Sequence, residues 1–228
     1  MNSVFSEPEH SDATGLPAHS LSEARVLGVL IEKQRTVPDT YPLSLNALLA
    51  GCNQKTSRDP VLELSESEVL SALDGLKAQD YILESSGGRV TRFGHNAERV
   101  LRLPSQAVAI VAVLLLRGPQ TPAELRANCD RLHRFADISA VEGFLEELAT
   151  RPAGALVTQL PRQPGTRETR WAQLLTGRPL AEAFQAPGSP SAPREANLEQ
   201  RLALLEAEVA IMKESLARLL ARPDSNSL

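Results

Sequence analysis

The sequence lacks several features that mark secreted, membrane and disulfide-rich proteins. Only two of its 228 residues are cysteines, which argues against a disulfide framework. The longest apolar run, residues 107–116, is far shorter than the roughly 20 residues that cross a bilayer. Residues 1–18 are polar and lack the basic start and apolar stretch of a signal peptide, so we expect a flexible tail there. These absences predict a cytoplasmic protein without a membrane partner.

The sequence also lacks the motifs of the common enzyme and cofactor classes. It contains no glycine-rich phosphate loop, no Gly-x-Ser-x-Gly element and no cluster of metal-binding residues. Cys129 and His133 have the spacing of neighbours on a helix, but zinc needs three or four ligands. We therefore expect a non-enzymatic protein that holds no cofactor and no metal.

An internal repeat is the most informative feature that is present. Three apolar residues follow a Ser-x-x-Glu helix start twice, 72 positions apart: Val69, Leu73 and Leu76, then Val141, Leu145 and Leu148. Leu48 and Cys52 recur 77 positions later as Leu125 and Cys129. A repeat of this kind predicts two copies of one small unit. We expect both cysteines to be small core residues, with a redox pair as the alternative.

Each copy contains signals for three helices and a hairpin. In the first copy, the expected helix starts are Ser20, Ser44 and Ser65, and the expected strands are residues 81–84 and 89–92. In the second copy, the starts are Ser105, Thr121 and Ser139, and the strands are residues 155–160 and 169–174. The second copy's first helix is apolar all round, so we expect both copies to pack on it. Three helices followed by a hairpin is the order of a winged helix.

A separate helix is predicted near the carboxyl end. Its apolar residues alternate at spacings of four and three, which is the pattern of a coiled-coil seam. The seam residues are Leu198, Leu202, Leu205, Val209, Met212, Leu216 and Leu219. The flanking charges would be opposite in sign in a parallel pair, so we expect the chain to dimerise through this helix. The alternative is a helix that folds back on its own domains, because short isolated helices are marginally stable.

The predicted fold class is mainly α with small β-hairpins (α+β), with two tandem winged-helix domains plus a C-terminal coiled-coil helix. The winged-helix domains are expected at residues 19–103 and 104–175. A linker rich in Pro, Gly, Ser and Ala spans residues 176–193 and leads to the coiled-coil helix at 194–222. Tails of residues 1–18 and 223–228 complete the chain.

Several segments resemble the YceH family of bacterial proteins. In the first copy they are residues 41–48, 52–55, 58–61 and 64–69, and in the second copy residues 117–126. The resemblance covers about residues 21–175, and residues 53–60 are its most specific part. It implies two tandem winged-helix domains. The family has no established biochemical function, so the resemblance assigns no functional residue.

The distribution of charge bears on nucleic-acid binding, the common use of a winged helix. The net charge is −4, and the third helix of each copy carries carboxylates that would repel phosphate: Glu66, Glu68, Asp74, Glu142, Glu146 and Glu147. The cations lie instead on the hairpins and on the loop before the first copy's third helix. The candidate nucleic-acid-binding residues are Lys55, Arg58, Arg89, Arg92, Arg162, Arg167 and Arg170. As alternatives, these side chains are solvated or pair with nearby acids, and Arg58 pins its loop internally.

Two functions fit these observations. The first is a DNA-associated regulatory protein whose hairpins contact phosphates of double-stranded DNA. The second is a protein–protein interaction scaffold or adaptor without direct DNA binding, which the acidic third helices and the predicted coiled coil also fit. The expected partners are therefore a second copy of the chain, double-stranded DNA or another protein.

Overall fold

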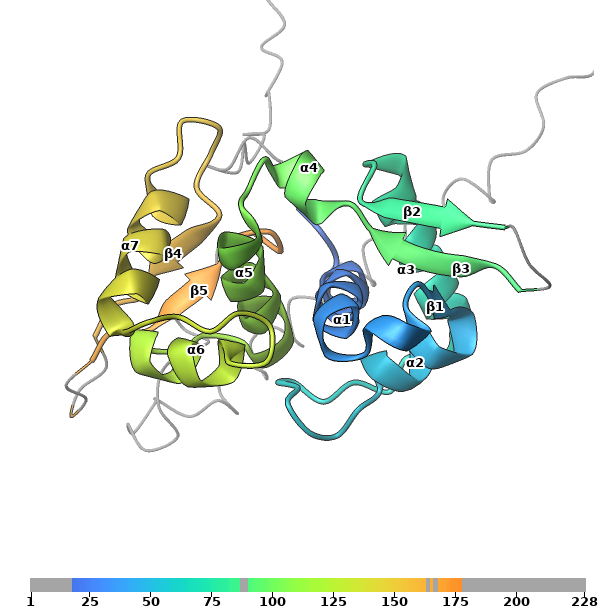
Figure 1. The fold of residues 1–228 in the computed structure, drawn as a ribbon, viewed down its shortest axis with the longest axis horizontal. Coiled ribbons are helices and arrows are strands. Elements are labelled where there is room, and N and C mark those ends of the chain that lie inside the picture. Colours follow the sequence, from blue (N-terminus) through green and yellow to red (C-terminus); the bar gives the residue numbers. More distant parts are fainter. Residues whose placement is uncertain (1–17, 87–89, 163–164, 166–167, 178–228) are drawn as a thin grey trace, which may run out of the picture. The chain divides into compact units, whose positions relative to one another are not determined.

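The computed structural model describes residues 18–86, 90–162, 165 and 168–177 (Figure 1). The chain divides into a compact unit of Met1–Phe184 and a second unit of Gln185–Leu228, and every described residue belongs to the first. The predicted coiled-coil helix and its seven seam residues lie outside the described residues, as do Arg89, Arg167 and most of the predicted linker. Dimerisation through that helix therefore stays a prediction.

The first repeat contains the expected three helices and hairpin. Its elements are α1 (Leu21–Thr36), the 3-10 turn η1 (Pro38–Thr40), β1 (Leu43–Ser44), α2 (Leu45–Cys52), α3 (Glu66–Ala78), β2 (Ile82–Ser85), β3 (Arg92–His95) and α4 (Ala97–Leu101). Ser20 and Ser65 form the predicted capping boxes at the starts of α1 and α3. Ser44 caps α2 by accepting a hydrogen bond from the backbone N–H of Ala47.

The second repeat has the same order of elements. They are α5 (Ser105–Arg117), α6 (Pro122–Cys129), α7 (Ile138–Ala149), β4 (Val157–Gln159) and β5 (Trp171–Gln173). Thr121 forms the predicted capping box of α6. The other two predicted caps are wrong. The N-cap of α5 is Pro104, which has no side chain able to cap, and α7 is capped by Asp137 instead of Ser139.

The first hairpin also differs from its prediction. Its second strand is Arg92–His95, three residues later than expected, and its register pairs Ile82 with His95. The register follows burial, because Ile82, Phe93 and His95 all lie in the protein interior, while Val90 is exposed. The sequence signals used above also missed β1 and α4.

The pairing of strands confirms that the two copies are built alike. In the first repeat, β1 pairs with β3 through Leu43 and Phe93. In the second repeat, an isolated bridge joins Gln120 to Trp171 at the same place. Leu43 and Gln120 are 77 positions apart, which is the offset that relates the two cysteines. The described residues thus form two similar α+β modules, each with a small antiparallel sheet.

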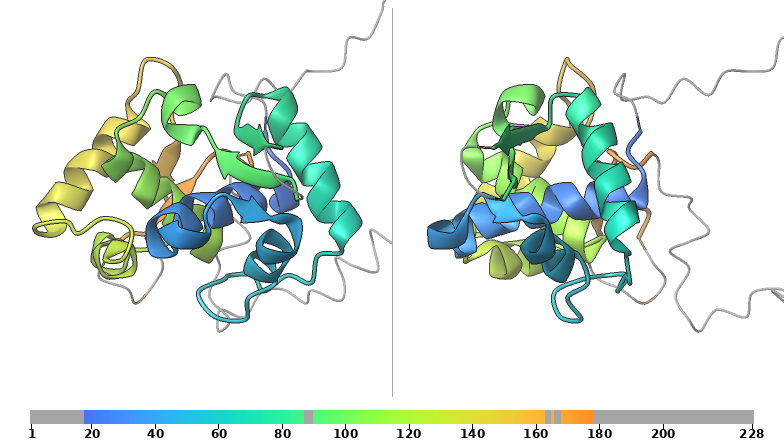
Figure 2. Two further views of the ribbon diagram at one scale, coloured as in Figure 1. Left: turned by 45° about the vertical axis from the view of Figure 1, so that its right-hand side comes forward. Right: turned by 90° about the vertical axis from the view of Figure 1, so that its right-hand side faces the viewer.

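One continuous core joins the two repeats. Helices α1 and α5 pack against each other between them (Figures 1 and 2). Residues 107–116 of α5 are all buried, which confirms that both copies pack on this helix. Gly28 lets the helices approach closely, since a Cβ atom there would lie 2.9 Å from the Leu116 side chain. The predicted boundary at residues 103 and 104 therefore separates the repeats but does not divide the core.

Two further expectations concern the membrane and the cysteines. Among the described residues, no helix combines the length and apolar character needed to cross a bilayer. Cys52 and Cys129 are both free and fully buried, as expected for small core residues. Burial raises the pKa of each thiol to about 12, which disfavours the thiolate that redox chemistry needs.

Candidate nucleic-acid interface

The predicted candidate residues lie on three parts of the described chain. Lys55 and Arg58 belong to the loop between α2 and α3, Arg92 begins β3, and Arg162 and Arg170 lie in the connection between β4 and β5. They do not form one cluster. Among the described candidates, only Arg58 and Arg170 line the same cavity, which holds about 310 Å³ and lies between the repeats. Each candidate is therefore considered with its own contacts.

Arg58 is buried and engaged with Glu32 of α1. Its guanidinium donates to both carboxylate oxygens, with Nη1 3.1 Å from Oε1 and Nη2 2.7 Å from Oε2. It also donates to the carbonyls of Gly51 and Ser57 and to the Gln54 side chain. The Arg58 side chain has 0% exposure and is engaged with acceptors of the protein itself, so its contact with phosphate stays a prediction. It pins its loop, with Glu32 as the partner.

The electrostatics of Glu32 agree with this role. Burial by itself would raise the pKa of the Glu32 carboxyl, but the hydrogen bonds and charge of Arg58, helped by Lys33, outweigh burial and lower it. A second buried arginine, Arg25, donates to the backbone carbonyls of Cys52 and Pro60. The two arginines thus hold both ends of the loop, and Lys55 remains exposed at its surface.

The hairpin arginines differ in how far they are engaged. Arg92 is exposed, but its Nη1 donates to the carbonyls of Thr40 and Pro42, at 3.3 and 2.8 Å. Arg170 pairs with Glu124 at 2.9 Å and donates to the carbonyl of Pro119. Both guanidinium groups are thereby tied to the protein. Arg162 and Lys55 are exposed and make no hydrogen bond or ion pair with any described residue.

The segments that carry the family resemblance meet at the junction of the repeats. The backbone N–H of Asp59 donates to the carbonyl of Leu116 at 2.8 Å. The Arg117 guanidinium donates to the hydroxyl of Ser57 at 2.7 Å. These bonds connect the most specific part of the resemblance, residues 53–60, to the start of residues 117–126. These two segments, far apart in the sequence, thus contribute to the packing of one repeat on the other.

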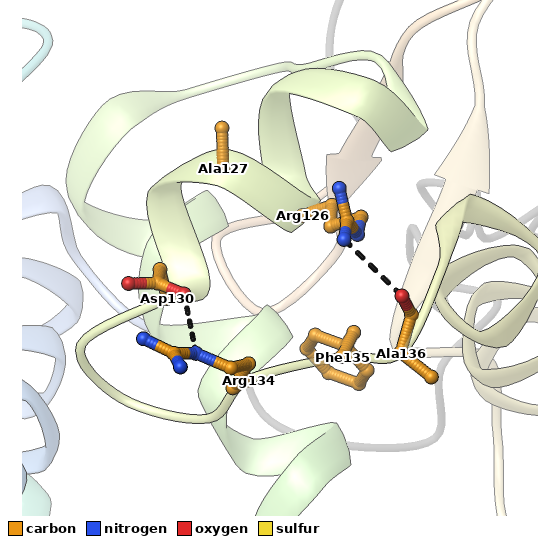
Figure 3. Close-up of a pocket in the computed structure, with 6 residues that line it drawn as sticks. All are labelled: Arg126, Ala127, Asp130, Arg134, Phe135 and Ala136. Carbon is orange, nitrogen blue, oxygen red and sulfur yellow. Dashed lines mark hydrogen bonds and ion pairs between the residues drawn. The ribbon is translucent and has the colours of Figure 1, made fainter.

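A basic segment on the second repeat escaped the sequence prediction. Arg126, at the end of α6, and Arg131 and Arg134, on the loop that follows, are all exposed. Arg126 and Arg134 line an open cavity of about 600 Å³ together with Ala127, Asp130, Phe135 and Ala136 (Figure 3). Three arginines within residues 126–134 were the sequence signal that could have revealed this surface.

The candidate surfaces give no indication of bound metal chemistry in the part of the chain that the structure describes. There, no group of three or more His, Cys, Asp or Glu side chains could hold a metal ion. His133, which has helical spacing from Cys129, packs its ring against Phe135 at 4.7 Å instead. The surfaces described above therefore offer charge and hydrogen-bond donors and no ligand set.

The chain is similar in sequence to one protein family and to several individual proteins. The family described as "Protein of unknown function, DUF480" matches residues 19–166. A UPF0502 protein of Dechloromonas aromatica is 59% identical over 203 residues, covering 88% of this chain and 95% of the relative. A UPF0502 protein of Leptothrix cholodnii is 54% identical over 204 residues, covering 86% and 91%. A UPF0502 protein of Burkholderia thailandensis is 55% identical over 221 residues, covering 95% and 91%.

Proposed function

The chain belongs to the DUF480 family, an uncharacterised bacterial family also described as UPF0502, and we propose that it is a tandem winged-helix protein that associates with double-stranded DNA. The YceH name remains a resemblance. The repeated order of three helices and a hairpin supports the winged-helix assignment. So does the short segment before the second helix, which pairs with the second hairpin strand in both repeats. We propose a cytoplasmic, non-enzymatic protein.

The observation that carries the proposal is the separation of charge on the described surface. The carboxylates of α3 and α7 are exposed, including Asp74 and Glu146. Exposed cations lie on loops and hairpin ends, including Lys55 and Arg162, and the third helices carry only one, Lys77 of α3. Such a surface would contact the phosphate backbone from its loops and would keep the third helices out of the major groove. Contacts of this kind position a protein on DNA without reading the base sequence.

A second candidate function is a protein-binding adaptor. It is favoured by the same exposed carboxylates, by the engagement of Arg58 inside the protein and by the ion pair of the half-exposed Arg170 with Glu124. A dimer formed through the predicted coiled-coil helix suits either function, because two copies would double the binding surface. Deletion of residues 197–228 tests the dimer, since the solution mass of the truncated chain should fall to that of a monomer.

The two functions are separated by the affinity of the full-length chain for duplex DNA. Fluorescence anisotropy with a labelled 20-base-pair duplex would be measured from 50 to 200 mM salt. Phosphate binding predicts an affinity that falls steeply with salt, by a slope of about 0.9 per phosphate contacted. The Lys55→Gln/Arg162→Gln variant should lower the affinity at every salt concentration. If the wild-type chain does not bind at 50 mM salt, only the adaptor function is left.

A further inference from the structure

We propose that the end of α6 and the α6–α7 loop form the main phosphate-binding surface of this protein. This inference rests on the proposed function and assigns it to one place on the second repeat. The surface consists of Arg126, Arg131 and Arg134, named here the α6–α7 arginine cluster. Its ligand would be the backbone of double-stranded DNA, held by guanidinium groups that match phosphate in geometry and charge.

Two members of the cluster, Arg126 and Arg134, line a hollow that is open to solvent, while Arg131 is exposed on the α6–α7 loop and is not among the lining residues. Figure 3 shows Arg126 extending from α6 and Arg134 extending from the loop, with Phe135 lying between Arg134 and Ala136 in the view. The cavity holds about 600 Å³. Phe135, its one large apolar residue, is itself buried and faces the core. Since protein interfaces usually centre on an exposed apolar or aromatic anchor, the cavity suits phosphate better than a protein partner.

The acids near the cluster leave its positive charge available. Asp130 pairs with Arg134 at 3.0 Å, but the two side chains are 52% and 81% exposed. An exposed ion pair of this kind is weak, so phosphate could replace the carboxylate. Asp137 uses its carboxylate to cap α7, accepting from the N–H of Ala140 at 2.8 Å. Arg131 has no hydrogen bond or ion pair with any residue that the structure describes.

Hydrogen bonds within the protein brace the α6–α7 loop. The backbone N–H groups of Leu132 and His133 both donate to the carbonyl of Cys129, at 2.7 and 2.8 Å. Arg126 spans the loop by donating to the carbonyl of Ala136 at 3.1 Å. A surface that is already ordered loses little conformational entropy on binding, which favours affinity.

The first repeat has no equivalent of this cluster. At the offset of 77, the positions of Arg126, Arg131 and Arg134 are taken by Leu49, Gln54 and Ser57. The loop's own arginine, Arg58, is buried against Glu32. The second repeat is therefore the one that presents guanidinium groups at this place in the fold.

The test compares two variants that each remove two positive charges. Arg131→Gln/Arg134→Gln removes charge from the cluster, while Arg126 is kept because it braces the loop. Arg99→Gln/Arg102→Gln is the matched control. Arg99 lies on α4 and Arg102 directly follows it, and both are exposed and unpaired within the described residues. Binding of the labelled duplex is measured on the full chain from 50 to 200 mM salt, after thermal unfolding has shown unchanged stability.

The proposal expects the cluster variant to bind about tenfold more weakly at 50 mM salt, with a salt slope lower by about 2. The control should stay within about twofold of the wild type, as expected for a purely local effect. A cluster variant that binds like the wild type overturns the inference and leaves the proposed function intact. Equal losses in both variants also overturn it, because net charge would then explain them. Failure of the wild type to bind removes the proposed function itself.

The choice of DNA over an acidic protein is tested in the same assay. Polyglutamate of matched total charge is added as a competitor against the labelled duplex. Because guanidinium pairs are matched to phosphate on a duplex, unlabelled duplex should compete far better than polyglutamate. Equal competition would overturn the assignment of DNA and identify an acidic polypeptide as the ligand class.

Discussion

The two repeats anchor the same loop with different chemistry. Each loop buries one side chain six positions after its equivalent cysteine: Arg58 after Cys52, and Phe135 after Cys129. Arg58 is held by the Glu32 carboxylate and by backbone carbonyls. Phe135 packs in the apolar core, with its ring 5.8 Å from that of Phe144. The position is buried in both repeats, but one anchor is ionic and the other is aromatic.

This difference shows how a duplicated fold can divide its surface roles. An ionic anchor uses an arginine inside the protein, so the first loop presents only Lys55 as an exposed cation. The aromatic anchor of the second loop uses no arginine, so the arginines of that loop remain exposed to solvent. The asymmetry between the loops therefore follows from how each is attached to the core, and each attachment can be tested separately.

The largest effect should follow removal of the ionic anchor. Arg58→Ala removes the partner that binds both carboxylate oxygens of the largely buried Glu32, leaving it Lys33 at 3.3 Å, and removes the donors to the carbonyl of Gly51. Breaking a buried ion pair in this way costs about 4 kcal/mol of unfolding free energy. Urea unfolding followed by circular dichroism would measure the loss.

The control for this prediction is the exposed ion pair of the other loop. Arg134→Ala breaks the contact with Asp130, and its cost should stay below about 0.5 kcal/mol because both side chains face solvent. The double variant Arg58→Met/Glu32→Leu should recover part of the loss, since neither member of the pair is then left buried without the other. Equal stabilities of Arg58→Ala and Arg134→Ala would show that the two loops are attached alike.

Removal of the aromatic anchor should have the next largest effect. Phe135→Ala opens a cavity beside Phe144 and His133, and a truncation of this kind costs about 3 kcal/mol. The same unfolding measurement applies, with Phe135→Leu as the milder control. If Phe135→Ala unfolds at the wild-type urea concentration, the loop does not depend on this ring.

Local sequence signals were sufficient for much of this architecture. The capping boxes at Ser20, Ser65 and Thr121 depend on residues three positions apart, and all three are present. The repeat predicted that the two sets of helices would be equivalent. The predicted start of α7 is wrong because Ser139 and Glu142 also have capping-box spacing, whereas the 72-residue offset from Ser65 falls on Asp137, the true cap.

The candidate site was harder to predict, because it depends on contacts between distant segments. Arg58 and Glu32 are 26 residues apart, and no local pattern shows that α1 lies over the α2–α3 loop. Arg170 and Glu124 are 46 residues apart and meet through the fold of the second hairpin. The exposure of the α6–α7 arginine cluster likewise depends on Phe135 holding the loop. A list of cations in the sequence cannot separate anchors from contact residues.

Another contrast between the repeats concerns how their stability depends on pH. His95 lies at the end of β3, and its counterpart on β5 is Gln173, which does not titrate. Burial, helped by the charge of Arg35, lowers the pKa of His95 to about 4. Between that value and the ordinary 6.5, the unfolded chain binds more protons than the folded one. The contribution of His95 to the free energy of unfolding is therefore most favourable above pH 6.5. The free energy of unfolding decreases as the pH falls, by about 2 kcal/mol between pH 7 and pH 5.

The control removes the titrating group and makes the first repeat resemble the second. His95→Gln should flatten the dependence of unfolding free energy on pH between 7 and 5. Some dependence will remain, because burial also lowers the pKa of His19. If the wild type and His95→Gln lose stability in parallel over this range, the histidine is not buried in its neutral form.

The smallest effect concerns how the two third helices start. The start of α3 is a capping box built on Ser65, whereas α7 is capped by the carboxylate of Asp137 alone. Asp137→Ala removes the acceptor for the N–H of Ala140 and should cost about 1 kcal/mol of unfolding free energy. Ser139→Ala, at the position that the capping-box spacing favours, should change it by less than about 0.5 kcal/mol. The opposite ranking of the two variants would move the helix start to Ser139, and α3 and α7 would then begin with the same motif.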